Sequence, residues 1–81
     1  MLFLVIEKYK NTKEVNKRFK EKGRMMPEGM AYVASWLSLD GNTCYQINDC
    51  ATEELLHEWA SFWNDIVDFE FIPVMNSIAI S

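Results

Sequence analysis

The chain has 81 residues, which is the size of one domain and too small for two. Hydrophobic residues make up 49% and aromatic residues 14%, which excludes a disordered tail, and the formal net charge of -4 argues against a nucleic-acid-binding protein, which would carry a basic stripe. The apolar opening run ends at Glu7 and is too short for a membrane span or for the core of a signal peptide. We therefore expect a soluble, cytoplasmic, globular domain.

The first part of the chain predicts a strand followed by a helix. Residues 2–6 are five consecutive apolar residues, a pattern typical of a strand that is buried on both faces. Asn11 is followed three positions later by Glu14, which is the spacing of a helix capping box, and Gly23 is a natural place for that helix to end. Residues 24–29 contain proline and glycine without any periodicity and indicate a structured loop.

The middle of the chain predicts a β-hairpin. Residues 30–39 are rich in β-forming side chains, Asp40-Gly41 suits a type I′ turn, and residues 43–48 form the return strand. This turn places Trp36 opposite Tyr45. Because side chains alternate along a strand, one face should carry Tyr32, Ala34, Trp36, Tyr45 and Ile47. The other face should carry Val33, Ser35, Leu37, Cys44, Gln46 and Asn48.

A second helix and a last strand follow the hairpin. Thr52 is predicted to cap the helix, with Glu53 and Glu54 in the first turn, where the helix dipole favours anions. Apolar residues at helical spacing share one face of this helix: Leu55, Leu56, Trp59, Phe62 and Trp63. Residues 67–74 predict the last strand, in which Pro73 marks an edge position or the strand end.

The order of the predicted elements is β-α-β-β-α-β, which is the split βαβ or ferredoxin-like arrangement. In this α+β fold, two helices cover one face of a four-stranded antiparallel sheet. We expect a single domain over residues 1–75 and a C-terminal tail over residues 76–81. In this tail, Ile78 and Ile80 are apolar side chains that have the character to dock on the domain.

The sheet face without helices should be polar in a monomer, but the strands are apolar on both faces. The last strand, for example, has Phe69 and Phe71 on one face and Ile72 and Val74 on the other. An exposed apolar sheet face of this size is typical of an interface. We therefore expect a homodimer through the helix-free sheet face. The alternative is a monomer whose small twisted sheet leaves some apolar area in water.

Short stretches throughout the chain resemble a known family. They are Arg18-Phe19, Gly23-Arg24-Met25, Pro27-Glu28-Gly29, Tyr32-Val33, Ser35-Trp36, Cys44-Tyr45-Gln46, Trp59, Trp63, Asp68-Phe69-Glu70 and Pro73-Val74. With them the chain resembles the bacterial domain-of-unknown-function family numbered thirty-three oh three, assigned to the dimeric α/β-barrel group. The resemblance implies two sheets packed face to face and no particular activity. Related barrels include cofactor-independent monooxygenases, isomerases, stress-responsive barrels and haem-degrading enzymes, but the last use an asparagine on the first strand, and this first strand has none.

No motif in the sequence predicts a metal or a cofactor. His57, the single histidine, falls on the polar face of the second helix, and Cys44 and Cys50 have neither zinc spacing nor a nearby histidine. Cys44 is expected to be a small buried residue. Several carboxylates are expected to be solvated surface charges: Glu7, Glu28, Asp49, Asp68 and Glu70.

The candidate ligand site lies near the loop over residues 24–29, because this irregular segment crosses between helix and strand. We predict that Arg24, Glu28 and Trp36 form one candidate group there, with Trp36 as a wall of the pocket. Gln46 falls on the opposite face by the hairpin register and belongs with any site in the interior of the dimer. The alternative is a filled core in which Arg24 pairs with Glu28 and orders the loop.

Three functions are compatible with these observations. The first is a homodimeric module that binds or senses a small, mostly apolar molecule. The second is a cofactor-independent monooxygenase or isomerase that uses the same pocket. The third is a structural or interaction domain without a ligand. The lack of a clear acid–base set favours the first and third over the second.

Overall fold

Strand β1 (Leu2–Tyr9) lies inside a four-stranded antiparallel sheet with the order β2-β3-β1-β4. It pairs on one side with β3 (Thr43–Cys50) and on the other with β4 (Val67–Val74), while β2 (Met30–Leu37) pairs with β3 at the edge. The computed structural model describes residues 1–79. The central position of β1 explains its continuous apolar run. The order of elements and strands confirms the predicted ferredoxin-like fold.

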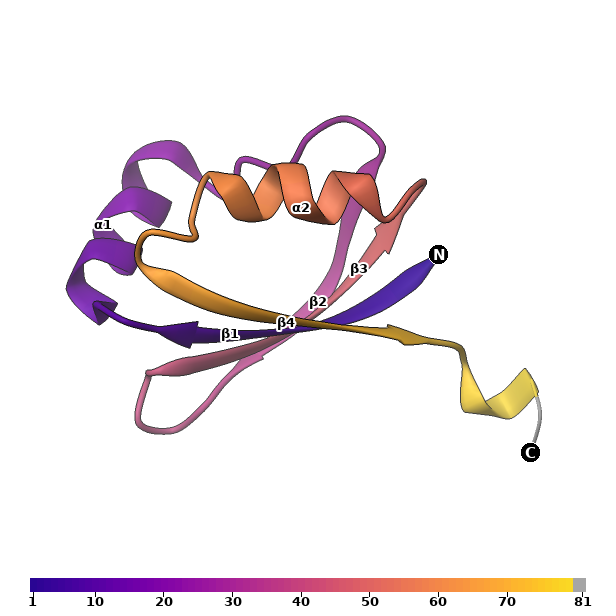
Figure 1. Ribbon diagram of the computed structural model, residues 1–81. Helices are drawn as coiled ribbons and strands as arrows, with labels where there is room; N and C mark the ends of the chain where they lie inside the picture. The colour runs from indigo at the N-terminus through magenta and orange to yellow at the C-terminus, as the bar shows by residue number, and fades with distance from the viewer. Residues whose placement is uncertain (80–81) are drawn as a thin grey trace.

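Two helices, α1 (Thr12–Lys22) and α2 (Glu54–Ser61), lie on the same face of the sheet and leave the other face bare (Figure 1). The start of α1 is the predicted one, because the side-chain oxygen of Asn11 accepts a hydrogen bond from the backbone N–H of Glu14 at 3.1 Å. Its end is also as predicted. Gly23 follows the helix with a φ of 67°, a conformation that glycine adopts without strain.

The start of α2 differs from the prediction. Thr52 does not cap the helix; Glu53 stands at the capping position and makes no side-chain cap hydrogen bond. The backbone N–H of Leu56 donates to the carbonyl of Glu53 at 3.0 Å, so a backbone bond closes the first turn. Residues 62–63, which were expected in the helix, lie in the turn that follows it.

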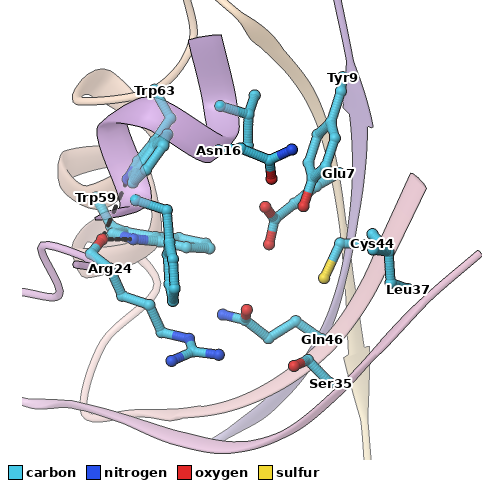
Figure 2. A pocket seen from close by; sticks show the side chains of 12 residues that line it. Glu7, Tyr9, Asn16, Arg24, Ser35, Leu37, Cys44, Gln46, Trp59 and Trp63 are labelled. Carbon is cyan, nitrogen blue, oxygen red and sulfur yellow. Dashed lines mark hydrogen bonds between the residues drawn. The ribbon is translucent and has the colours of Figure 1, made fainter. Parts of the chain in front are cut away.

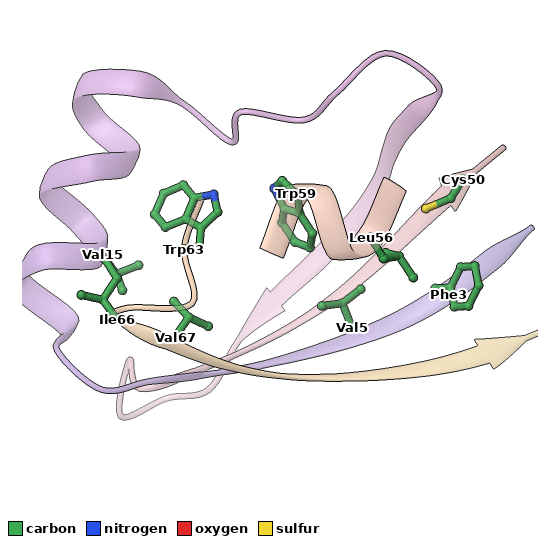
Figure 3. Packing of buried hydrophobic residues seen from close by; sticks show 9 residues of the cluster. All are labelled: Phe3, Val5, Val15, Cys50, Leu56, Trp59, Trp63, Ile66 and Val67. Carbon is green, nitrogen blue, oxygen red and sulfur yellow. The ribbon is translucent and has the colours of Figure 1, made fainter. Parts of the chain in front are cut away.

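The core is a single layer between the helices and the sheet. Figure 3 shows its buried residues running from α1 across α2 to the far end of β1 and β3. The residues of this cluster are Phe3, Val5, Val15, Cys50, Leu56, Trp59, Trp63, Ile66 and Val67. Trp59 and Trp63 are the largest of them and are 2% and 6% exposed, so each removes a large apolar area from water.

The hairpin has the predicted register near its turn and a β-bulge further on. Leu37 lies opposite Cys44 and Trp36 opposite Tyr45, as expected. The turn is not the predicted type I′, because Asp40 lacks the positive φ that this type requires; the N–H of Gly41 instead donates to the carbonyl of Ser38 at 2.8 Å, and residues 39–42 form the loop. The ladder then shifts between Tyr32 and Ala34, which adds one unpaired residue to β2. As a result, Tyr32 lies opposite Asn48 on the face that the helices cover, and its predicted place beside Trp36 is wrong.

The alternation along β1 shows which residues lie on each face of the sheet. Phe3, Val5 and Glu7 are buried beneath the helices, so the residues between them lie on the opposite side. With their partners in the neighbouring strands they form what we call the bare face: Leu2, Leu4, Ile6, Ala34, Trp36, Tyr45, Ile47, Ile72 and Val74. These are its apolar side chains, which no helix covers. The same face also carries exposed charges, because Asp49 lies opposite Leu2, Glu70 lies opposite Ile6, and Lys8 and Asp68 lie opposite each other at one end.

The C-terminal segment leaves the sheet after β4 and forms a short 3₁₀ turn, η1 (Ser77–Ala79), away from the core (Figure 1). Ile78 is 80% exposed, so it does not dock on the domain as expected. The expectation for Ile80 lies outside the described residues. In the part of the chain that the structure describes, no helix is long and apolar enough to cross a membrane.

Candidate functional site

A cavity of about 220 Å³ lies between α1, the segment that follows it, and the helix-covered face of the sheet (Figure 2). Its walls combine aromatic rings, including Phe19 and Trp59, with polar groups from the strands. The polar groups come from β1 and β3, chiefly Glu7 and Gln46, and Arg24 lies along the edge. The cavity therefore has the composition expected of a small-molecule site: apolar walls and a few convergent polar groups.

Glu7 is the most unusual group in this cavity. It is 9% exposed, and its Oε2 atom has no hydrogen-bond partner among the described residues. Figure 2 shows its carboxyl group pointing into the cavity from β1. Burial raises the pKa of Glu7 to about 7, against a smaller lowering by the positive charge of Arg24. This carboxyl group therefore changes its charge near neutral pH and is available to a ligand.

Two further ionisable groups, Tyr9 and Cys44, lie beside Glu7 in the cavity wall. Burial raises the pKa of Cys44 to about 11, so its thiol is protonated at neutral pH. Burial also raises the pKa of Tyr9, with the neighbouring thiol and carboxyl adding to the effect. Because only a thiolate is a good nucleophile, the site does not favour chemistry at Cys44.

Arg24 is held at the cavity by its backbone and by aromatic rings. Its carbonyl oxygen accepts hydrogen bonds from the indole N–H groups of Trp59 at 2.8 Å and Trp63 at 3.1 Å. Its guanidinium lies 3.8 Å from the ring centre of Tyr32 and 5.2 Å from that of Phe19. Two indoles, one from α2 and one from the turn that follows it, thus donate to one carbonyl, which fixes the loop and presents the guanidinium at the cavity edge.

The structure separates the residues of the predicted ligand group. Arg24 lines the cavity, whereas Glu28 is exposed outside it and Trp36 is 60% exposed on the bare face. No ion pair joins Arg24 and Glu28 among residues 1–79. Gln46, which was expected in the interior of a dimer, lines the same cavity as Arg24 instead. Whether these four residues bind a ligand stays a prediction.

Trp36 and Gln46 each lie on the face of the sheet that was predicted for the other, and this has a simple cause. The hairpin register correctly predicts that the two residues lie on opposite faces, but it does not say which face the helices cover. Gln46 pairs with Val5, which is buried in the core, and Trp36 lies opposite Tyr45, which pairs with Ile6 on the bare face. The pairing of the hairpin with β1 therefore decides which face of the hairpin the helices cover.

Glu7, which the sequence suggested as a solvated charge, is the main residue that sequence reasoning missed. A signal was present, because Glu7 continues the alternation of Phe3 and Val5 along β1. A carboxylate on the core-facing side of a central strand is rarely buried without a partner. Elsewhere, His57 is exposed, and no group of three or more potential metal ligands comes together among residues 1–79.

Comparison with known proteins gives a family. Residues 1–80 match the family described as "Domain of unknown function (DUF3303)". The chain belongs to this family. No curated protein and no solved structure shows a significant match to the chain. The resemblance noted from the sequence is thus confirmed, and because the DUF3303 description names no activity, the function has to be argued from the site.

Proposed function

We propose that this DUF3303 domain binds a small, mostly apolar molecule in the cavity between the helices and the sheet. The observation that carries the proposal is Glu7 Oε2, a buried carboxylate oxygen that borders the cavity and has no hydrogen-bond partner among residues 1–79. A buried polar group without a hydrogen bond costs on the order of 1–3 kcal/mol, and a bound molecule supplies the missing bond.

The size and walls of the cavity fit such a ligand. At about 220 Å³, the cavity exceeds the engineered apolar cavity of about 150 Å³ that binds benzene. Val15, Phe19 and Trp59 supply apolar wall, while Glu7 and Gln46 supply polar groups that orient a ligand. A molecule with one ring and one or two polar substituents matches this combination.

The test is a thermal-shift screen of small aromatic compounds against the intact protein. Ser35 lines the cavity, so Ser35→Phe fills part of it, whereas Ser61→Phe adds the same ring on the exposed side of α2. Compounds that raise the Tm of the wild-type and of Ser61→Phe, and do not raise that of Ser35→Phe, support the proposal. No stabilising compound in the screen, or equal shifts in all three proteins, contradicts it.

We propose further that the domain acts as a homodimer through the bare face. Each strand has eight residues, so the sheet measures roughly 26 Å by 19 Å at about 3.3 Å per residue and about 4.8 Å between strands. Two such faces in contact bury about 1,000 Å² or more, which is the area at which specific interfaces begin. A second copy presents the same apolar area, so a two-fold axis covers both faces at once.

Sedimentation at micromolar concentration tests the dimer. Trp36→Glu places a charge on the bare face and should convert a dimer into monomers, because a buried unpaired charge is costly. Leu39→Glu is the matched control, since Leu39 is a fully exposed apolar residue in the turn, outside the bare face. A wild-type protein that sediments only as a monomer would refute the dimer; a dimer without any cavity ligand would support a purely structural role.

Acid–base catalysis without a cofactor, as in an isomerase or a monooxygenase, is a second candidate. The raised pKa of Glu7, about 7, favours it, since a general base works best near the ambient pH. In an isomerase, the carboxylate of Glu7 takes a proton from the carbon beside a carbonyl and returns it to another atom of the enolate. Wild-type protein in D₂O should then speed deuterium uptake into cyclohexanone beyond the rate with Glu7→Gln; equal rates exclude this role toward that ketone.

A further inference from the structure

The two arginines of the chain have very different surroundings. Arg18 is fully engaged: it donates to both carboxylate oxygens of Asp65, at 2.7 and 2.8 Å, and to the carbonyl of Phe62 at 2.9 Å. Arg24 has no such partners within residues 1–79: its guanidinium lies near the rings of Tyr32 and Phe19, and it makes neither an ion pair nor a side-chain hydrogen bond there. A planar guanidinium fixed by stacking, with free donors along its edge, is the group that pairs with a carboxylate.

The cavity therefore has two unlike polar ends. Among the described residues, Arg24 lies at the cavity edge with unused donors, and Glu7 projects into the cavity from β1 with an oxygen that has no hydrogen-bond partner. Gln46 lies between them on the floor of the cavity in Figure 2, and Trp59 forms the apolar wall. No ion pair joins Glu7 to Arg24 among residues 1–79, so each end is free to contact a ligand.

We propose that the cavity binds a small organic acid in its carboxylate form, paired with Arg24, and that it binds this anion together with one proton held on Glu7. The proposal rests on the proposed function and names its ligand class. A single-ring carboxylate such as benzoate has the size for a cavity of about 220 Å³, given that benzene occupies one of about 150 Å³. The ring faces Trp59, and the protonated carboxyl of Glu7 donates a hydrogen bond to the ligand.

The proton that Glu7 holds in the complex is explained by electrostatics in a small, partly buried space. An anion next to Glu7 disfavours a second negative charge and also offsets the positive charge of Arg24, which now lowers the pKa of Glu7. The other ionisable groups that face Glu7 are Tyr9 from the same strand and Cys44 from β3, and both stay neutral because burial raises their pKa values. The residues that α1 and α2 place there, such as Asn16, do not titrate.

Calorimetric titration of the intact protein with benzoate tests this inference, with benzamide as the neutral isostere. With the pKa of free Glu7 at about 7, and benzoate bound only by the protonated form, the affinity should be about tenfold higher at pH 6 than at pH 8. Titration in buffers of different ionisation enthalpy should show uptake approaching one proton at pH 8. Benzamide should bind more weakly and with little dependence on pH.

Three variants separate the contributions of the two ends. Arg24→Gln should abolish benzoate binding, while Lys22→Gln removes a positive charge from the exposed end of α1 and should leave it unchanged. Glu7→Gln mimics the protonated carboxyl, so it should bind benzoate equally well at pH 6 and pH 8. Near-ultraviolet circular dichroism of each variant verifies that the fold is retained.

Several results would overturn this inference. If benzamide binds and benzoate does not, the inference that the ligand is an anion is refuted, while the proposal that the cavity binds a small molecule still holds. Benzoate binding that survives Arg24→Gln, or that has the same affinity at pH 6 and pH 8, refutes the assigned roles. If neither compound binds, the organic-acid inference fails; the proposed function fails with it only if the thermal-shift screen also finds no ligand.

Discussion

Both faces of the sheet carry a large apolar area, although the helices cover only one of them. The face that the helices cover holds the apolar core together with buried polar side chains, among them Glu7, Gln46 and Asn48. The bare face has apolar residues on all four strands, with the charged residues Asp49 and Glu70 among them. In an isolated two-layer domain the apolar face would be the covered one. In our proposals each face has a further occupant: a ligand that meets the buried polar groups beneath the helices, and a second copy of the chain on the apolar area of the bare face.

The largest expected effect compares neighbouring residues of β1 on the two faces. Phe3 is 1% exposed in the core, so Phe3→Ala should lower the free energy of unfolding by about 3–5 kcal/mol, enough to unfold many domains of this size. Leu4→Ala lies on the bare face and should cost less. In a dimer, the loss from Leu4→Ala should also shrink as the protein is diluted. Urea unfolding at two protein concentrations measures both losses, and a Leu4→Ala loss independent of concentration would contradict the dimer.

The next effect is the pH dependence of stability that arises from Glu7. Its pKa is raised from 4.5 to about 7 in the folded protein, so the folded state binds the proton more tightly. Its contribution is therefore fully present below pH 4.5 and is lost as the pH rises to about 7, by an amount on the order of 3 kcal/mol. Glu7→Gln should flatten the curve of unfolding free energy in this window and be more stable than the wild-type at pH 8.

The titration of other carboxylates should not obscure this dependence of the unfolding free energy on pH. Arg18 hydrogen-bonds Asp65 and lowers its pKa to about 2, so Asp65 loses its contribution at far lower pH and with the opposite sign. Unfolding by urea from pH 4 to pH 8 separates the contribution of Glu7 from that of Asp65. A wild-type protein whose stability rises steadily from pH 5 to pH 8 would show that Glu7 is not buried as described.

Much of the fold was predictable because local signals agree with it. The strand at residues 2–6 and the cap at Asn11 each have a spacing or a side chain suited to one conformation, and Asp40-Gly41 marks the place of the hairpin turn, although the turn is not of the predicted type. Together they give the element order, the strand pairing in the hairpin and the layer arrangement. Pairing near the turn was also correct, because turn geometry sets it locally.

The site was less predictable because it depends on pairing between distant segments. The bulge after Tyr32 adds a residue without a visible sequence signal and moves this ring toward Arg24. Which face of the hairpin meets the helices depends on its pairing with β1, forty residues away. Glu7 follows an apolar run and precedes a lysine, so its sequence neighbourhood suggests a solvated strand end rather than a buried acid.

A smaller effect tests whether the polar groups on the covered face stabilise one another. Gln46 is 3% exposed and donates to the side-chain oxygen of Asn48 at 3.0 Å. Gln46→Leu leaves this buried oxygen without its donor and should cost about 1–3 kcal/mol in unfolding free energy. Gln46→Glu, which removes the donor and adds a charge near Glu7, should cost more. If neither substitution changes the free energy of unfolding, water replaces this hydrogen bond.

The central claim is that the covered face holds a ligand and the bare face a second copy of the chain. Native mass spectrometry of freshly purified protein measures both in one spectrum. The account predicts a dimer whose subunits carry a small-molecule adduct, with the adduct lost in Ser35→Phe and the dimer lost in Trp36→Glu. A spectrum of monomers without any adduct, from protein that is folded by circular dichroism, would contradict it.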